Sequence, residues 1–147
     1  MTRLEATQKI LTAKTKKGLT FEAIAAAVGR HKVWMTAALL GQATMSKEEA
    51  QKAGAVLGLE PDVIAALQAI PTKGSLDQTV PVDPLIYRFH EITQVYGTTL
   101  KAIIHEMFGD GIMSAIDFEL DVQKKEDPKG DRVIVTMNGK FLPYKKW

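Results

Sequence analysis

The apolar residues between Asp83 and Val122 change their spacing part-way along this segment. Up to Phe108 they recur at the three- and four-residue intervals of an amphipathic helix. From Ile116 to Val122 they alternate with acidic residues, which is typical of a strand with one buried and one solvent-facing side. Since the first half of the chain carries helical patterns only, the sequence predicts an α+β fold.

The predicted helix begins with Asp83 as its N-cap and Pro84 at its first position. Gly97 has the character of a C′ residue, so we expect this helix to end there. A second helical run is predicted from residue 98 or 99 to 108, followed by a tight turn at 109–111. Ser114 then precedes the strand, at a turn-to-sheet junction.

Arg88 and Glu91 lie three residues apart, and therefore on one face of the first of these helices. The rest of the circumference of this helix is mostly apolar, which predicts that the helix is buried on more than one side. The apolar residues are Leu85, Ile86, Phe89, Ile92 and Val95. A guanidinium in such surroundings needs a partner or a ligand. Taken alone, the pair is an ordinary helix ion pair worth about 0.2–0.5 kcal/mol, and Ser114 is a turn residue.

The C-terminal third of the chain predicts a small antiparallel sheet. Its strands are expected at 116–123, 132–137 and 140–143, with Asn138-Gly139 as a two-residue hairpin turn. So few strands cannot cover their own apolar faces, and an isolated small sheet is marginally stable. Pairing with a second subunit would solve both problems.

The chain divides into an N-terminal helical bundle at 1–70, a Pro-containing connector at 71–83 and a C-terminal domain at 84–147. Five helices are predicted in the bundle, with capping boxes at Thr2/Glu5 and Ser46/Glu49 and with Pro61 opening the last helix. Residues 19–41 resemble a helix-turn-helix unit of the lambda-repressor type, with small Ala25 at the helix crossing and Gly29 at the turn.

That resemblance raises DNA binding as an alternative function. A recognition helix needs exposed polar side chains that reach base edges. Here Arg30, His31 and Lys32 are followed by the apolar run VWMTAALL. Most of this helix is therefore expected to pack against its neighbours, and we expect no nucleic-acid partner.

Composition narrows the remaining classes of function. The chain has 147 residues, 46% of them hydrophobic, which is sufficient for a packed core. It has no cysteine, which excludes disulfides, thiolate metal sites and a cysteine nucleophile. Its net charge of +2 is too small to indicate an anionic membrane or nucleic acid as partner. We see no signal peptide and no membrane-length apolar run, and we expect a cytoplasmic location.

The segment YRFHEITQVYGTTLKAIIHEMFGDGIMSAIDF, followed by FELDV and the ending GKFLPYKKW, resembles the cyanase family, also called cyanate hydratase or cyanate lyase. A looser likeness covers the N-terminal helices. The family's catalytic arginine, glutamate and serine correspond to Arg88, Glu91 and Ser114, with identical residue types. The resemblance further implies that Arg88 and Ser114 bind substrate and that Ile112 lines the pocket.

The resemblance implies that bicarbonate-dependent decomposition of cyanate yields ammonia and carbon dioxide through carbamate, for cyanate detoxification and nitrogen supply. It implies intertwined dimers, five of which form a homodecamer, with active sites between subunits. The resemblance implies bicarbonate as a co-substrate, and we expect no other cofactor. His90 and His105 lack HExxH spacing, so we expect no metal. A structural oligomer without activity is the third alternative.

Overall fold

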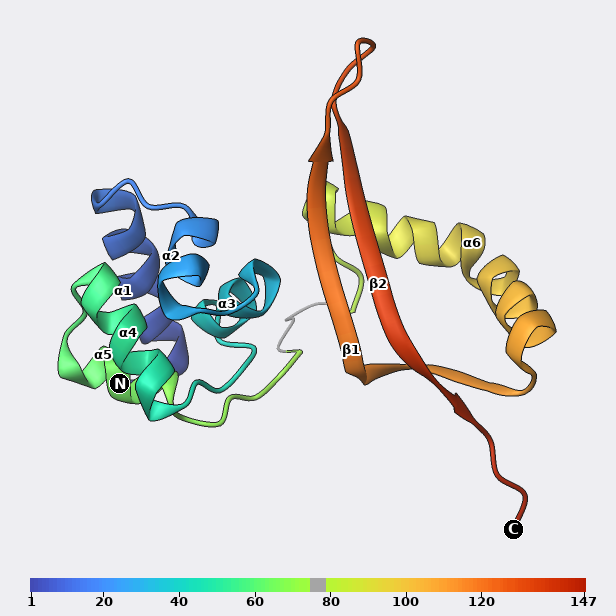
Figure 1. Cartoon of the computed structure of the whole chain (residues 1–147), viewed down its shortest axis with the longest axis horizontal. Coiled ribbons are helices and arrows are strands. Elements are labelled where there is room, and N and C mark those ends of the chain that lie inside the picture. The colour runs from blue at the N-terminus through green and yellow to red at the C-terminus, as the bar shows by residue number, and fades with distance from the viewer. Residues whose placement is uncertain (75–78) are drawn as a thin grey trace. The chain divides into compact units, whose positions relative to one another are not determined.

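The computed structural model describes residues 1–74 and 79–147 and has the predicted α+β fold (Figure 1). The chain divides into two compact units, Met1–Ser75 and Leu76–Trp147. Part of the predicted connector, residues 75–78, lies outside the described residues. The elements, in chain order, are α1 (Arg3–Lys16), α2 (Phe21–Val28), α3 (Lys32–Leu39), α4 (Lys47–Leu57), α5 (Pro61–Leu67), α6 (Pro84–Phe108), β1 (Gly111–Lys125) and β2 (Arg132–Pro143).

The five helices α1 to α5 of the N-terminal unit enclose one hydrophobic core. Every buried hydrophobic side chain among the described residues belongs to this unit, and the largest are Ile10, Ile24, Met35, Leu39, Met45, Leu57, Leu67 and Val63. The predicted number of helices is confirmed, and so is the start of α5 at Pro61.

Both predicted capping boxes are present. The Glu5 backbone N–H donates to the Thr2 hydroxyl at 3.2 Å, and the Thr2 N–H donates back to the Glu5 carboxylate at 2.7 Å. Ser46 and Glu49 form the same reciprocal pair at the start of α4. Each box satisfies two backbone donors that an uncapped helix would leave unpaired.

Helices α2 and α3 are joined by a short turn at residues 29–31, in which Gly29 adopts φ 82° and ends α2. Ala25 is buried, as expected for the contact between the two helices. Two of the basic groups near the start of α3 already face carboxylates: Arg30 bonds to Glu49, and the Lys32 ammonium lies 3.9 Å from Glu22.

The C-terminal unit begins with one continuous helix, so the predicted end at Gly97 is wrong. Asp83 caps α6 as predicted, accepting hydrogen bonds from the N–H groups of Leu85 and Ile86 at 2.9 Å each. Gly97 lies in the interior of α6 because a single glycine costs a helix only about 1 kcal/mol, which the long apolar run on both sides outweighs. No helix of the described chain is both long and apolar enough to span a bilayer.

The sheet is a single antiparallel hairpin of β1 and β2, which corrects three strand predictions. β2 runs without interruption through the predicted turn at Asn138-Gly139, where Asn138 pairs with Glu119 and Gly139 with Phe118. The chain reverses instead between Lys125 and Arg132, where the sequence EDPKGD supplies turn residues. β1 begins at Gly111, ahead of the predicted Ile116.

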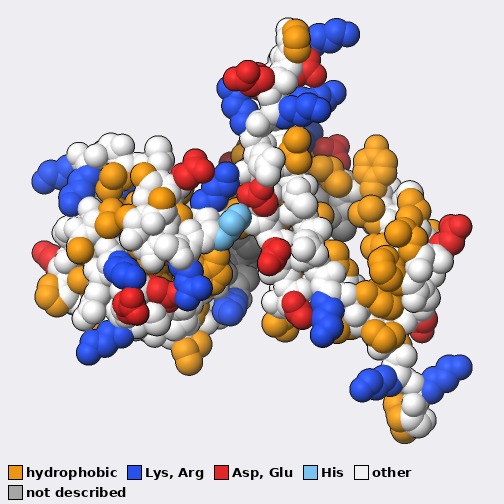
Figure 2. All heavy atoms as spheres, viewed as in Figure 1, with side chains coloured by type: hydrophobic (Ala, Val, Ile, Leu, Met, Phe, Trp, Pro, Cys, Tyr) orange, Lys and Arg blue, Asp and Glu red, His pale blue; other side chains and the backbone are white. Residues whose placement is uncertain are grey.

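The residues of the C-terminal unit that the structure describes form no hydrophobic core of their own. None of the residues of α6 is buried, and hydrophobic side chains lie exposed along it on the right of Figure 2. Burial of this helix on more than one side was therefore a wrong prediction for the single chain. One helix and two strands offer too little surface to cover the apolar side chains of α6.

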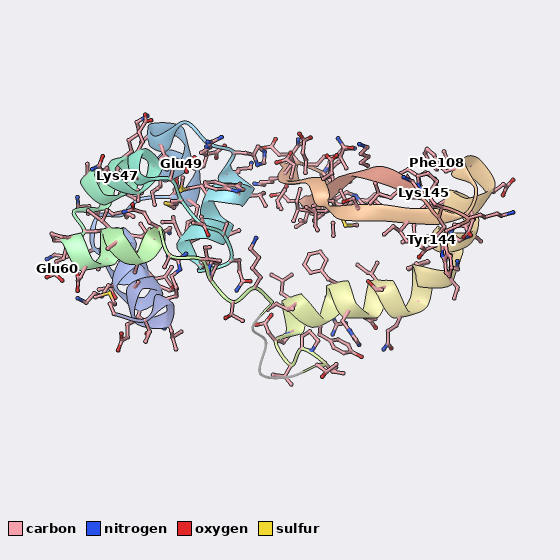
Figure 3. The ribbon with its side chains drawn as sticks, turned by 90° about the horizontal axis from the view of Figure 1, so that it is seen from below. Lys47, Glu49, Glu60, Phe108, Tyr144 and Lys145 are labelled. Carbon is pink, nitrogen blue, oxygen red and sulfur yellow. The ribbon has the colours of Figure 1, made fainter. Side chains whose placement is uncertain are left out.

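The Glu49 carboxylate links α4 to the turn after α2 and is almost fully buried, at the start of α4 in Figure 3. The Ser46 backbone N–H, together with Arg30 and the Ser46 hydroxyl, holds the pKa of Glu49 below its usual value, although burial opposes this shift. A carboxyl whose folded-state pKa is lowered stabilises the fold above its unfolded pKa and loses that contribution as pH falls through the folded value.

We therefore expect Glu49→Gln to lower the thermal midpoint of the N-terminal unit at pH 7 and to have a smaller effect at pH 3. Differential scanning calorimetry of the full chain at both pH values measures this. Glu48→Gln is the matched control, because Glu48 lies in the same turn but is exposed and forms an ion pair with Lys52. Equal effects of the two substitutions at pH 7 would contradict the role assigned to Glu49.

Candidate active site

Arg88 and Glu91 form an ion pair on the first turns of α6. The Arg88 Nη1 lies 3.1 Å from Glu91 Oε2, and the side chains remain 59% and 47% exposed. Arg88 Nε also donates to the Pro84 carbonyl at 3.2 Å, and the guanidinium lies 5.3 Å from the centroid of the Tyr87 ring. Glu91 and the Pro84 carbonyl thus hold the guanidinium in place, while much of it stays accessible to a ligand.

Ser114 lies inside β1, which corrects the predicted turn-to-sheet junction. The pairing of the hairpin shifts between Met113 and Phe118, so that residues 114–117 bulge opposite the single residue Lys140. Figure 1 shows β1 turning sharply at this place. A bulge of this kind bends a strand and redirects its side chains.

The Ser114 hydroxyl holds this bulge together. Its Oγ accepts hydrogen bonds from the Ile116 N–H at 3.1 Å and from the Asp117 N–H at 2.9 Å. Ser114 is 5% exposed and is one of two buried polar or charged side chains in the described part of the chain, the other being Glu49.

A serine hydroxyl has two acceptor lone pairs and one proton. Two backbone N–H groups use both acceptor positions of Ser114, so its proton is the only hydrogen-bonding capacity left. The bulge therefore makes Ser114 a donor, and it leaves the oxygen poorly placed to act as a nucleophile or a base.

The junction between α6 and β1 is fixed by three contacts that the sequence did not predict. The His105 ring lies 3.1 Å from the Gly111 carbonyl through Nε2, and the Phe108 and Phe141 rings stack with centroids 5.0 Å apart. The Tyr144 N–H donates to the Asp110 carbonyl at 3.1 Å. Phe108 and Tyr144 lie together at this end of the unit in Figure 3. Spacing alone gave no signal for the last two, because each joins residues more than 30 positions apart in the sequence.

The structure holds the two halves of the predicted site on separate elements of one unit. Arg88 and Glu91 lie on α6, whereas Ser114 and the half-exposed Ile112 lie at the start of β1. Across residues 1–74 and 79–147, neither member of the ion pair is bonded to Ser114. Over the same residues, no group of three His, Cys, Asp or Glu side chains is arranged to hold a metal ion.

Two family models together match almost the whole chain. Residues 78–146 match the cyanate lyase C-terminal domain, and residues 3–71 match the cyanate hydratase N-terminal domain. The chain belongs to the cyanate hydratase (cyanase) family. The predicted family is confirmed, and with it the prediction that the chain is an enzyme of the lyase class.

Individual members of the cyanase family are similar to this chain over all or nearly all of their length. A cyanate hydratase of Synechococcus sp. (strain CC9311) is 62% identical over 96% of this chain and 94% of its own. One from Parasynechococcus marenigrum (strain WH8102) is 58% identical over the whole of both chains. The crystal structure of cyanase from T. urticae superposes with a TM-score of 0.85 at 45% identity, covering 94% of this chain and 96% of that one.

Ser114→Ala is expected to expose the Ile116 and Asp117 amides to exchange, because the hydroxyl that accepts hydrogen bonds from both is removed. Hydrogen exchange of the assembled protein, followed by mass spectrometry of peptides spanning 114–117, measures this. Peptides from the paired region 119–125 should exchange as in the unsubstituted protein. Unchanged exchange at 116 and 117 would show that the hydroxyl does not hold the bulge.

Proposed function

We propose that this member of the cyanase family decomposes cyanate in a bicarbonate-dependent reaction that passes through carbamate. The observation that carries the proposal is the match to cyanate hydratases over the full chain, including the segment with Arg88, Glu91 and Ser114. Cyanate and bicarbonate are both small anions. The site must therefore supply fixed positive charge and hydrogen-bond donors.

Arg88 is the group that binds anionic oxygens in this proposal. Its guanidinium is planar, permanently charged and able to donate two parallel hydrogen bonds, which lysine cannot reproduce. Glu91 orients it through the 3.1 Å ion pair. A free carboxylate beside two anions would repel them, so the paired state of Glu91 favours the positioning role.

Ser114 donates a hydrogen bond to substrate oxygen or nitrogen. Its two acceptor positions are occupied by the Ile116 and Asp117 amides, which supports donation over nucleophilic attack. Ile112, two residues earlier on β1, would supply an apolar wall. An apolar wall excludes water and strengthens the charge interactions beside it.

The reaction can proceed without a nucleophile from the protein. A bicarbonate oxygen attacks the cyanate carbon; the adduct takes up one proton and loses carbon dioxide to leave carbamate. Carbamate takes up a second proton and divides into ammonia and a second carbon dioxide. The protein holds the reactants together, which can lower the barrier by roughly 7 kcal/mol or more. No metal or other cofactor enters this scheme.

A second copy of the chain completes the site in this proposal. Arg88 and Glu91 together carry no net charge, so one chain offers little field to attract two anions. Symmetric assembly would place several copies of Arg88 around one pocket and cover the exposed apolar side chains of α6. We propose intertwined dimers, five of them in a decamer, in a cytoplasmic enzyme serving cyanate detoxification and nitrogen supply.

Ammonia release by the purified protein tests the reaction. We expect release from cyanate when bicarbonate is present and little when dissolved carbon dioxide has been stripped from the buffer. Release at equal rates with and without bicarbonate would contradict the co-substrate role. No release in either case from an assembled protein would favour a structural oligomer, and salt-dependent binding to DNA would favour the regulator alternative.

Arg88→Lys is expected to lower kcat/KM for cyanate by about 100-fold or more, because the bidentate contact is lost while the charge is kept. The assembled mass, measured by analytical ultracentrifugation, should not change. Arg132→Lys is the matched control, since Arg132 is exposed at the start of β2 and forms an ion pair with Asp127. Loss of assembly in Arg88→Lys would assign Arg88 to the fold instead of the reaction.

A further inference from the structure

We propose that Gly139 is a positioning residue for Ser114: the absence of a side chain at 139 is what allows the bulge at 114–117 to form and to orient the Ser114 hydroxyl. Gly139 lies on β2, outside the segment that carries Arg88, Glu91 and Ser114. The catalytic importance of Gly139 rests on the proposed function of Ser114. The effect of Gly139 on the conformation of Ser114 does not depend on that proposed function.

Gly139 touches the bulge at its first residue. A Cβ atom at position 139 would lie 2.4 Å from the Ser114 carbonyl oxygen, 2.6 Å from Met113 Cγ and 3.2 Å from Phe118 Cδ2. The methionine side chain can rotate away. The Ser114 carbonyl belongs to the backbone of β1, so it can clear a methyl group only if the bulge itself moves.

Backbone conformation does not require glycine at this position. The glycines with positive φ are Gly18, Gly29, Gly41, Gly58, Gly74, Gly109 and Gly130, and Gly139 is not one of them. Other residues could therefore adopt its φ and ψ angles within β2. Glycine is needed because the backbone of β1 approaches closely at Ser114. A close approach of another backbone is a common reason for a glycine inside a strand.

The carbonyl and hydroxyl of Ser114 are coupled through one Cα atom. The hydroxyl bonds to the Ile116 and Asp117 amides only while residues 114–117 keep their compact path. A Cβ atom 2.4 Å from the carbonyl oxygen forces that oxygen to move, and moving it changes both hydrogen-bond distances. The hydroxyl then recovers free acceptor positions and loses its fixed donor direction.

The variants Gly139→Ala, Ser114→Ala and their combination test this in the full-length assembled protein. We expect Gly139→Ala to speed hydrogen exchange of the Ile116 and Asp117 amides, as Ser114→Ala does, and to leave the paired regions 119–125 and 132–138 protected. Each single variant should lower kcat by about 100-fold, the usual effect of losing one preorganised donor. The double variant should be no slower than Ser114→Ala, because both changes act through one hydroxyl.

Gly97→Ala is the matched control. It is the same substitution in the same unit, and a Cβ there would meet only Thr93 Cγ2, at 3.8 Å. It should leave exchange at 116 and 117 unchanged. Its kcat is not compared, because Gly97 lies on α6, which the proposed assembly covers. Unchanged exchange at 116 and 117 in Gly139→Ala, kcat losses that multiply in the double variant, or failure of Gly139→Ala to assemble would each overturn the proposal. The last outcome would make Gly139 a requirement of the hairpin as a whole.

The two readouts separate this inference from the proposed function. Wild-type kcat in Ser114→Ala would remove Ser114 from the reaction. Faster exchange at 116 and 117 in Gly139→Ala would still establish that Gly139 positions the Ser114 side chain.

Discussion

The described residues of the C-terminal unit do not bury the apolar surface of that unit, and the proposed site and the proposed assembly depend on this constraint. Among its described residues only Gly111 and Ser114 are buried, while the side chains of α6 remain largely accessible. Exposed apolar area costs about 25 cal/mol per Å², so a unit of this composition gains stability mainly by covering that area. The N-terminal unit, which has a complete core, needs no such cover. The proposed assembly would supply that cover for the half of the chain that carries the candidate active site.

The same constraint agrees with the electrostatics of the proposed reaction. A single Arg88–Glu91 pair is neutral overall and half exposed to solvent, where charge interactions are weak. Covering α6 with another chain would remove water from the pair and could bring in a second guanidinium. The association of two chains would then both bury the apolar side chains of α6 and add positive charge to the site. Folding of the C-terminal unit and formation of the anion site would be coupled in this arrangement.

Features set by neighbouring residues could be predicted from the sequence, whereas features set by distant residues could not. The capping boxes at Thr2 and Ser46 depend on residues three positions away, and both predictions are confirmed. Gly97 and Asn138-Gly139 are common local signals for a helix end and a turn, and both predictions are wrong. Packing of the long apolar run outweighs the first signal. The second fails because the reason for Gly139 lies across the sheet at Ser114, 25 positions earlier in the numbering.

Ser114 shows how one hydroxyl can serve the fold and the proposed chemistry without conflict. Its oxygen bonds to two backbone amides of the bulge, and those bonds leave its proton for a substrate. Alanine at this position would remove both contributions. A serine without these two amide contacts would have a hydroxyl that rotates freely. A freely rotating donor loses rotational entropy when it binds a substrate. The bulge fixes the direction in advance, so the strand irregularity that sequence periodicity did not predict is the feature that would suit this serine to its proposed role as a donor.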